Sequence, residues 1–329
     1  MRPPRFARQR CAGGIQAILR HIILALMPGS IQYRQVNINF IRSRLGIASR
    51  KRRPCFKGAS DVQKTPMRHA ILLVAFGASS PQGQNALKGF DALVRQRYPG
   101  IPVRWAYTSL LLRERMAQAR QKSDSVFKAV CRLGLERFEA VAVQPLQTIP
   151  GQEHGDVRAA VEEAAEHEHL LCRIGAPLLA TADDVRATAR ALVRHLPAER
   201  SADEDVVFMG HGAEHEAVAR YVDLASAVRE LDSRVHVGAM NGAVTLESIL
   251  PNLASRRVWL MPLLSVVGRH ALEDMAGENG HSWRSRIEAQ GHQCLPVLMG
   301  TAEYADVAEI WLRHLEDAVQ SLAAGWEKR

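Results

Sequence analysis

Short apolar runs that end in glycine or small polar residues alternate with amphipathic segments from residue 67 onward. The first run, HAILLVAFGASS (69–80), is followed by apolar residues at helical spacing that stop at Pro99-Gly100. A continuous apolar strand is buried on both faces, and its alternation with helices is typical of a parallel α/β fold. The same pattern predicts further strands at 102–109, 138–146 and 172–179, and helices at 111–133, 156–170 and 181–196.

The strand motifs occur twice in the same order. The similar pairs are LLVAFGAS (72–79) with VVFMGHGA (206–213), VRWAYTS (103–109) with VHVGAMN (235–241), and PLQTIPGQEH (145–154) with PLLSVVGRHA (262–271). We therefore predict two similar lobes, each a parallel sheet flanked by helices, with an active-site cleft between them. The predicted N-terminal lobe spans residues 67–204 and the C-terminal lobe residues 205–329.

Basic residues are concentrated before the first strand. Residues 1–66 hold 14 Lys and Arg and a single acid, Asp61, for a net charge of +13. The other 263 residues hold 29 basic and 33 acidic residues, a net charge of −4. A basic nucleic-acid-binding surface is therefore not expected in the globular part, although the whole chain carries +9.

The basic extension has several readings. We expect residues 1–66 to be disordered or an upstream extension, because they combine few acids with mixed apolar and basic residues. The stretch GGIQAILRHIILALMPGS (13–30) is too short and too charged to span a membrane, and it is a poor match to a signal peptide. Five scattered cysteines without a CxxC motif suit a reducing compartment. We expect a cytoplasmic location, or a periplasmic one if residues 1–30 act as a leader.

Four polar residues follow predicted strand ends, two of them histidines. They are His211, Asn241, Glu153 and His270. In parallel sheets, ligands bind beyond the carboxyl ends of the strands, and two histidines with a carboxylate suit a divalent metal that must be released during turnover. The alternatives are a turn histidine at 211, a helix-start histidine at 270 and a solvated carboxylate at 153.

Other polar motifs carry weaker indications. EHEH (166–169) has the composition of a metal cluster, but it ends an acidic helix and is more typical of a solvated face. His215, one turn beyond His211, could reach the same cleft or face solvent. GENGHSW (277–283) lacks the spacing of a phosphate-binding loop, and the chain has no GxSxG or HExxH motif. Neither ATP nor NAD is indicated.

Taken together, the motifs LLVAFGAS, AYTS, VAVQPLQTIPGQEH, VVFMGHGAEHEA and LMPLLSVVGRHALEDMAG resemble those of the anaerobic-type sirohydrochlorin cobaltochelatases, which are ATP-independent class II chelatases. The resemblance covers about residues 67–320. It implies a chelatase-like fold with a sirohydrochlorin-type tetrapyrrole in the cleft and Co²⁺ as the substrate metal. It also implies that His211 binds cobalt and accepts pyrrole protons, that His270 is a second ligand, and that Glu153 assists. The oligomeric state stays open, with a homo-oligomer among the alternatives.

Two positions depart from the family pattern. VGAMNGAV places Asn241 where the family has a metal-binding Glu, and His281 stands where the family favours an acid. An amide oxygen can bind a metal, but it brings no charge. The departures leave open an alternative function, a tetrapyrrole- or metal-binding homologue with weak chelatase activity or with activity toward Fe²⁺ or Ni²⁺.

Overall fold

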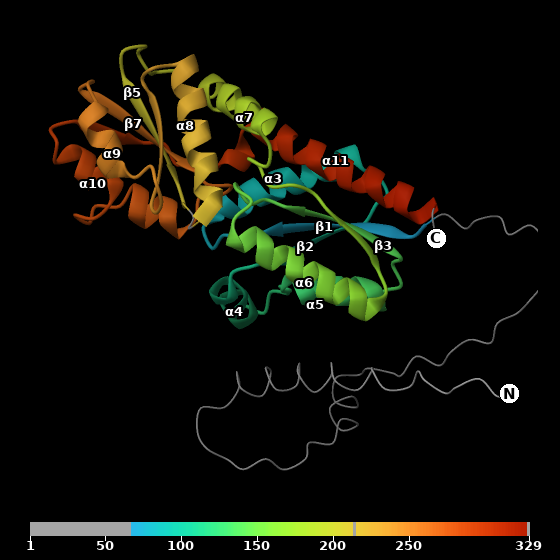
Figure 1. The fold of residues 1–329 in the computed structure, drawn as a ribbon. Helices are drawn as coiled ribbons and strands as arrows, with labels where there is room; N and C mark the ends of the chain where they lie inside the picture. Colours follow the sequence, from blue (N-terminus) through green and yellow to red (C-terminus); the bar gives the residue numbers. More distant parts are fainter. Residues whose placement is uncertain (1–66, 213–214, 328–329) are drawn as a thin grey trace, which may run out of the picture. The chain divides into compact units, whose positions relative to one another are not determined.

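The structure is a computed structural model that describes residues 67–212 and 215–327, with the backbone alone at 215, 216 and 327. The predicted extension 1–66 lies outside these residues. The described chain contains two four-stranded parallel sheets (Figure 1). The first has the order β2-β1-β3-β4, with β1 (His69–Ala75), β2 (Val103–Tyr107), β3 (Ala140–Pro145) and β4 (Leu171–Ile174). The second has the order β6-β5-β7-β8, with β5 (Asp205–Gly210), β6 (Val235–Ala239), β7 (Arg257–Leu263) and β8 (Gln293–Pro296). The predicted α/β fold with two similar lobes is confirmed.

Helices cover both faces of the two sheets. Their bounds are α3 (Pro81–Arg97), α4 (Leu110–Gln118), α5 (Val126–Leu135), α6 (Gln152–Glu168), α7 (Ala182–Arg194), α8 (Ala219–Leu231), α9 (Leu246–Ile249), α10 (Trp283–Glu288) and α11 (Ala305–Glu327). Short 3₁₀ turns are η1 (His215–Val218), η2 (Leu250–Asn252) and η4 (Thr301–Glu303), and η3 (His270–Met275) is a π-helical turn. None of the helices in the described ranges combines the length and apolar character needed to cross a membrane.

Strand β1 shows how the first sheet is buried on two sides. Because successive side chains of a strand point to opposite faces, its alternate residues enter different hydrophobic cores. Ile71 and Leu73 belong to the core that includes residues of α3 and α11, whereas Leu72 and Val74 belong to the core with α5 and α6. All four are fully buried, which accounts for the unbroken apolar run in the sequence.

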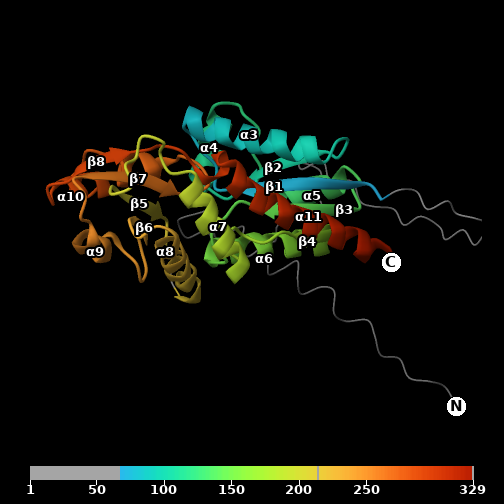
Figure 2. The same ribbon diagram turned by 90° about the horizontal axis from the view of Figure 1, so that it is seen from above.

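The second sheet repeats this arrangement and shares a core with the first. Val206 and Phe208 of β5 belong to the same core cluster as Ile71 and also pack with α7 and α8, which contact each other. Val207 and Met209 enter a separate core with η3, α9 and α10. One hydrophobic cluster therefore runs through both lobes, on the side where α3, α7, α8 and α11 lie (Figure 2).

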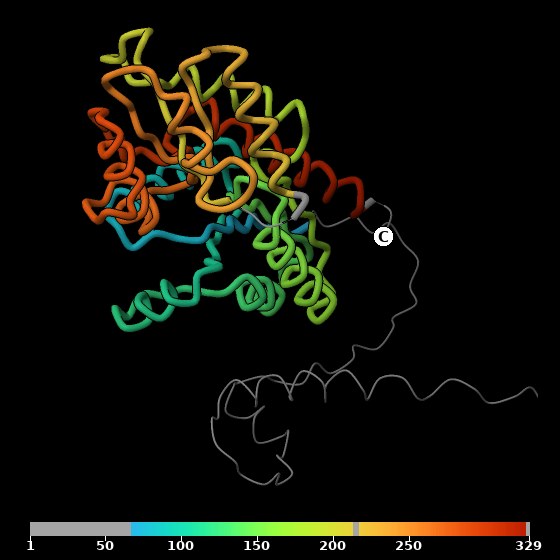
Figure 3. Tube along the Cα trace, turned by 60° about the vertical axis from the view of Figure 1, so that its left-hand side comes forward, coloured from blue at the N-terminus to red at the C-terminus, as the bar shows by residue number. Residues whose placement is uncertain are grey.

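The last helix returns to the first lobe. The chain passes from the first sheet to the second and then back, as its colouring shows (Figure 3). Helix α11 packs against β3 and β4 of the first sheet and against α7, and its Trp311 and Leu315 are fully buried. The division between lobes at residues 204 and 205 stays a prediction. Helix α11 lies in the predicted C-terminal lobe by sequence, but it contacts the sheet of the N-terminal lobe.

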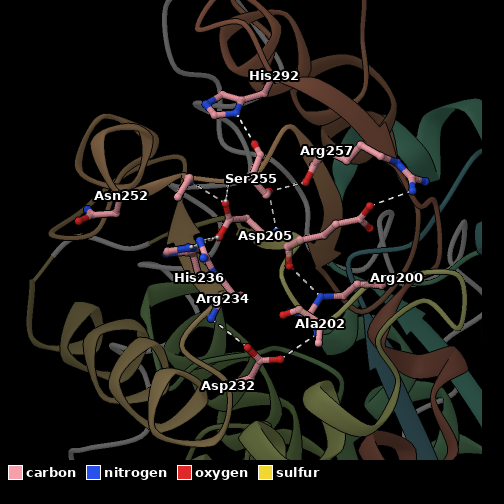
Figure 4. Close-up of polar contacts among 12 residues, drawn as sticks. Arg200, Ala202, Asp205, Asp232, Arg234, His236, Asn252, Ser255, Arg257 and His292 are labelled. Carbon is pink, nitrogen blue, oxygen red and sulfur yellow. Dashed lines mark hydrogen bonds and ion pairs between the residues drawn. The ribbon is translucent and has the colours of Figure 1, made fainter.

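A buried carboxylate closes the amino-terminal end of the second sheet (Figure 4). Asp205, the first residue of β5, accepts hydrogen bonds from the backbone N–H groups of Ala254 (2.8 Å) and Ser255 (2.7 Å). Its other oxygen lies 3.5 Å from His236 Nε2 and 3.6 Å from Arg234. Because β5 is parallel, this network lies at the end of the sheet opposite the loop that carries His211.

Candidate metal centre

Three loops of the second lobe begin at the same edge of its sheet. Gly210, the last residue of β5, is in register with Ala239 of β6 and with Leu263 of β7. The loops that follow carry His211, Asn241 and His270. Because β6 and β7 lie on either side of β5, the three loops are neighbours at the carboxyl end of the sheet, where parallel α/β folds bind ligands.

The two predicted histidines lie side by side. The ring centroids of His211 and His270 are 5.0 Å apart, with the ring planes at 68°. His211 is exposed and His270 is partly exposed, so both imidazoles are accessible to a metal ion. A pair of neutral imidazoles is a suitable partial ligand set for a borderline divalent cation.

A carboxylate holds the second histidine. The Nδ1 atom of His270 lies 2.6 Å from Oδ2 of Asp274, one turn further along η3. A carboxylate at this position favours the tautomer in which Nδ1 carries the proton, which leaves the Nε2 lone pair free to bind a cation. Single π-helical turns are rare and occur often at functional sites. Asp274 was not assigned from the sequence, although it lies in the quoted motif.

The glycines on both sides of His211 are explained by close backbone contacts. A Cβ atom at Gly210 would lie 2.3 Å from Cε1 of Tyr221. Gly212 has φ +93°, and a Cβ atom there would lie 2.2 Å from the backbone oxygen of Asn241. The N–H of Gly212 donates to the Tyr221 hydroxyl at 3.4 Å. The loop of His211 is therefore held between α8 and the loop of Asn241.

Asn241 comes close to His211 through its backbone. Its neighbour Met240 donates an N–H to the carbonyl of Gly210 at 3.0 Å, which continues the pairing of β5 and β6. The Asn241 side chain is exposed, and within residues 67–212 and 217–326 it has no hydrogen-bond partner. A side-chain amide with unused donors and an unused acceptor thus lies at the predicted carboxylate position.

Glu153 comes from the other lobe and is not bonded to either histidine in the described structure. It is exposed in the first turn of α6, and Gly151, just before it, approaches Ala217 of η1. Burial raises the pKa of the Tyr221 phenol to about 12. The hydrogen bond from the Gly212 N–H opposes this rise, and the charge of Glu153 adds to it. Glu153 is therefore electrostatically coupled to the residue that supports the His211 loop.

A further histidine lies next to Glu153. His154 is partly buried, and burial, with the charge of Arg158, lowers the pKa of its imidazole. His154 lies in the sequence motif PGQEH, but its position in that motif did not distinguish it from an ordinary surface histidine. The side chain of His215, which the sequence also places near the cleft, lies outside the described residues.

The loop that carries His270 is tied to the first lobe. The hydroxyl of Ser80, which caps α3, donates to the carbonyl of Val267 at 2.6 Å. On its other side the loop receives the N–H groups of Thr301 (to Leu264, 2.8 Å) and Ala302 (to Ser265, 3.0 Å). Ser80 thus connects the lobes by binding Val267, which lies three residues before His270.

Substitution of Ser80 by alanine is expected to slow metal insertion about fivefold, the equivalent of one hydrogen bond worth about 1 kcal/mol. The loss of the Val267 contact loosens the loop that positions His270. Ser125, which caps α5 by accepting from Lys128 N, provides the matched control, because it loses a helix cap without a contact between lobes. Equal steady-state rates for the Ser80→Ala and Ser125→Ala variants would show that the contact has no positioning role.

The glycine-rich segment GENGHSW has a structural role. Ser282 is fully buried, caps α10, and donates its hydroxyl to the carbonyl of Gly277 at 2.6 Å. The backbone N–H of His281 donates to Asn279 Oδ1 at 3.0 Å, and the His281 side chain is exposed. The segment therefore forms the turn between η3 and α10.

Comparisons with known proteins identify the family. The model of the family described as cobalt chelatase (CbiK) matches residues 69–320. The chain is 52% identical over 265 residues to the sirohydrochlorin cobaltochelatase CbiKC of Nitratidesulfovibrio vulgaris, covering 79% of this chain and 94% of that protein. It is 31% identical over 262 residues to the sirohydrochlorin cobaltochelatase of Salmonella typhimurium, covering 77% and 97%.

Solved structures agree on the fold. SirB from Bacillus subtilis with Fe³⁺ is similar with a TM-score of 0.55 and 16% identity, covering 80% of this chain and 98% of that one. SirB from Bacillus subtilis subspecies spizizenii in complex with cobalt gives a TM-score of 0.55 and 14% identity, covering 77% and 96%. The family match spans most of the chain and includes His211, Asn241 and His270, so the protein belongs to the cobalt chelatase (CbiK) family.

Proposed function

We propose that this protein inserts Co²⁺ into a sirohydrochlorin-type tetrapyrrole. The observation that carries the proposal is the pair of accessible imidazoles, 5.0 Å apart, at the carboxyl end of the second sheet. The proposal is supported by relatives that are named sirohydrochlorin cobaltochelatases and are aligned over nearly their whole length. Neither ATP nor NAD has a role in it, and a cytoplasmic location stays a prediction.

Metal insertion sets two chemical requirements. The macrocycle exchanges two N–H protons for one M²⁺ ion, so a base must accept protons while a ligand set releases the metal. Three or four strong protein ligands would hold the ion too firmly, whereas an incomplete set of imidazoles leaves positions for the pyrrole nitrogens. We assign His211 as base and metal ligand, because it is exposed and unpaired with a carboxylate in the described structure.

His270 is assigned as the second metal ligand. Its contact with Asp274 at 2.6 Å holds the ring and keeps Nε2 available, as second-shell carboxylates do at other metal sites. The same contact leaves Nε2 as the one basic atom of His270, and we assign that atom to the metal ion. The two pyrrole protons are therefore assigned to His211, which accepts one at a time and passes it to solvent. The two histidines thus have different roles that follow from their different partners.

Glu153 and Asn241 complete the proposal. Glu153 contributes negative charge from the first lobe, which favours an approaching cation. Asn241 offers a neutral amide oxygen in place of a carboxylate, which weakens the hold on the metal ion. A cobalt- or tetrapyrrole-binding homologue with little turnover is the second candidate function, and Asn241 is the observation that favours it.

The substitution Asn241→Glu separates these two functions. If the site is degenerate, a carboxylate at 241 should raise the rate of metallation about tenfold or more, because it restores a charged ligand. If the site is adapted to an amide, the rate should stay the same or fall, because the metal is held more tightly. Asn241→Gln, which keeps the charge at zero, controls for the change in side-chain length.

The assay of function uses the full chain with sirohydrochlorin. Absorption of the tetrapyrrole is followed after addition of Co²⁺, Fe²⁺ or Ni²⁺ in turn, with a reaction without protein as the baseline. We expect the protein to accelerate Co²⁺ insertion above that baseline. Binding of sirohydrochlorin without any acceleration by any of the three metals would reject the chelatase proposal and support the binding homologue.

A further inference from the structure

The acidic end of α6 meets a cysteine of the neighbouring helix. His167 and Glu168 belong to the EHEH motif, for which the sequence favoured a solvated face over a metal cluster. In the structure α5 packs along α6 and brings Cys131 to these two residues. One donor atom from each, a thiol sulfur, an imidazole nitrogen and a carboxylate oxygen, all lie within 4.8 Å of one another.

The close approach of the two helices depends on a glycine. Gly134 lies one turn after Cys131 on α5, and a Cβ atom there would lie 2.7 Å from Glu168 Cβ and 2.9 Å from Glu168 Oε2. A glycine inside a helix destabilises it relative to alanine, so the space it provides is the reason for its presence. The Glu168 side chain is only 16% exposed and is held against α5 beside Cys131.

The histidine completes the cluster from its open side. His167 Nδ1 lies 2.9 Å from Glu168 Oε1, and the ring contacts Phe127 of α5 with centroids 6.4 Å apart. Because its side chain is 65% exposed, an ion from solvent can reach the cluster without any opening of the fold. The cluster therefore combines a partly buried carboxylate and thiol with an accessible imidazole.

The donor set selects the kind of ion. Sulfur, nitrogen and carboxylate ligands together suit Zn²⁺ and Co²⁺ rather than Mg²⁺ or Ca²⁺, which prefer oxygen alone. Ligand bonds of about 2.0–2.3 Å place tetrahedral donors about 3.5 Å apart. Any pair of donors in the cluster that is farther apart than this, up to 4.8 Å, must therefore come closer on binding. We propose that Cys131, His167 and Glu168 form a second binding site for a borderline divalent cation, with one coordination position left to solvent.

This cluster cannot share its ion with the candidate metal centre. Glu153 and His167 lie on the same helix fourteen residues apart, which corresponds to about 21 Å at 1.5 Å per residue. The sulfur-containing site is therefore separate from the His211 and His270 pair, and it does not depend on the proposed function.

The charges around the thiol favour a cation. The carboxylates of Glu168 and Glu163 lie close enough to the Cys131 thiol to act on it electrostatically. The same negative charges attract a divalent ion, which then stabilises the thiolate that binds it.

Cobalt titration tests the site, because Co²⁺ bound to a thiolate has a charge-transfer absorption that nitrogen and oxygen ligands lack. The full chain is used with His211→Ala and His270→Ala, which remove the candidate metal centre, and with Cys11→Ser and Cys55→Ser, which remove the cysteines outside the described residues. We expect one equivalent of Co²⁺ to bind with a thiolate band. Zn²⁺ should displace it.

The variants give each outcome a meaning. In the same background, Cys131→Ser should abolish the band, and Glu168→Gln and Gly134→Ala should each weaken Co²⁺ affinity about tenfold or more. Cys294→Ser removes a buried cysteine of the second lobe and should leave the band unchanged. Absence of a thiolate band in the parent protein would overturn the proposal, as would a band that persists in Cys131→Ser. Melting temperatures without metal check that each variant is folded.

Discussion

Replacing His211 with alanine is expected to reduce the rate of Co²⁺ insertion into sirohydrochlorin at least about 10²-fold. General-base catalysis alone contributes about 10²–10⁴-fold, and this residue also loses a metal ligand. The structure supports a local effect, because the exposed imidazole contacts His270 but is not part of a hydrophobic core. The initial rate of tetrapyrrole metallation measures the change.

The control for this prediction is a histidine at the other end of a sheet. His69 begins β1, and among the described residues its ring hydrogen-bonds only with the carbonyl of Met67, at 3.1 Å, so His69→Ala should keep the parental rate. Melting temperatures of both variants should match the parent within a few degrees. A folded His211→Ala protein that metallates at the parental rate would remove His211 from the mechanism.

The second large effect concerns stability. Asp205→Ala is expected to lower the free energy of unfolding by about 3–5 kcal/mol, as the loss of one partner of a buried charged network does. The substitution leaves the N–H groups of Ala254 and Ser255 without an acceptor and His236 without its carboxylate. Chemical denaturation measures the change. Asp183→Ala, at a carboxylate that is 87% exposed, should alter the free energy by less than about 0.5 kcal/mol.

The same carboxylate predicts a dependence on pH. Burial raises the pKa of Asp205. The interactions with His236 and with the backbone of Ser255 and Ala254 lower it by more, so the pKa lies well below its ordinary value. A carboxylate whose pKa is depressed in the folded state contributes its full stabilisation at any pH above its unfolded pKa of about 3.9. This contribution is lost progressively as the pH falls from that value toward the folded pKa. Asp205→Asn should therefore unfold with a shallower pH dependence below about pH 4. An identical slope in parent and variant would contradict this assignment.

Local sequence patterns were enough to predict the fold class. The apolar runs of β1 and β5 are buried on both faces, so their composition reflects their environment directly. Boundaries were less accurate where a tertiary constraint interrupts a helix. The single helix predicted at 111–133 is two helices, α4 and α5, because Arg120 has φ 56° and Ser125 begins a new helix with its side chain.

The candidate site was predictable where it depends on sheet topology. His211 and His270 were expected together because both follow strands of one parallel sheet, and the structure places them in contact. Asp274 and Ser80 were not expected. The first depends on a π-helical turn, and the second on a contact between residues 187 positions apart, so no local pattern indicates either. The roles of Glu153 and Asn241 stay predictions.

The return of α11 to the first sheet has a consequence for synthesis on the ribosome. The first sheet is complete once residue 174 has been made, but β3 and β4 lack the helix that packs on them until residues 305–327 emerge. The second sheet, which ends at residue 296, can form before that moment. The nascent chain therefore exposes an apolar surface while residues 175–304 are being made, which is the condition in which chaperones are needed. A stop codon just before residue 305 would leave every residue of the candidate metal centre in place and the first lobe unable to close.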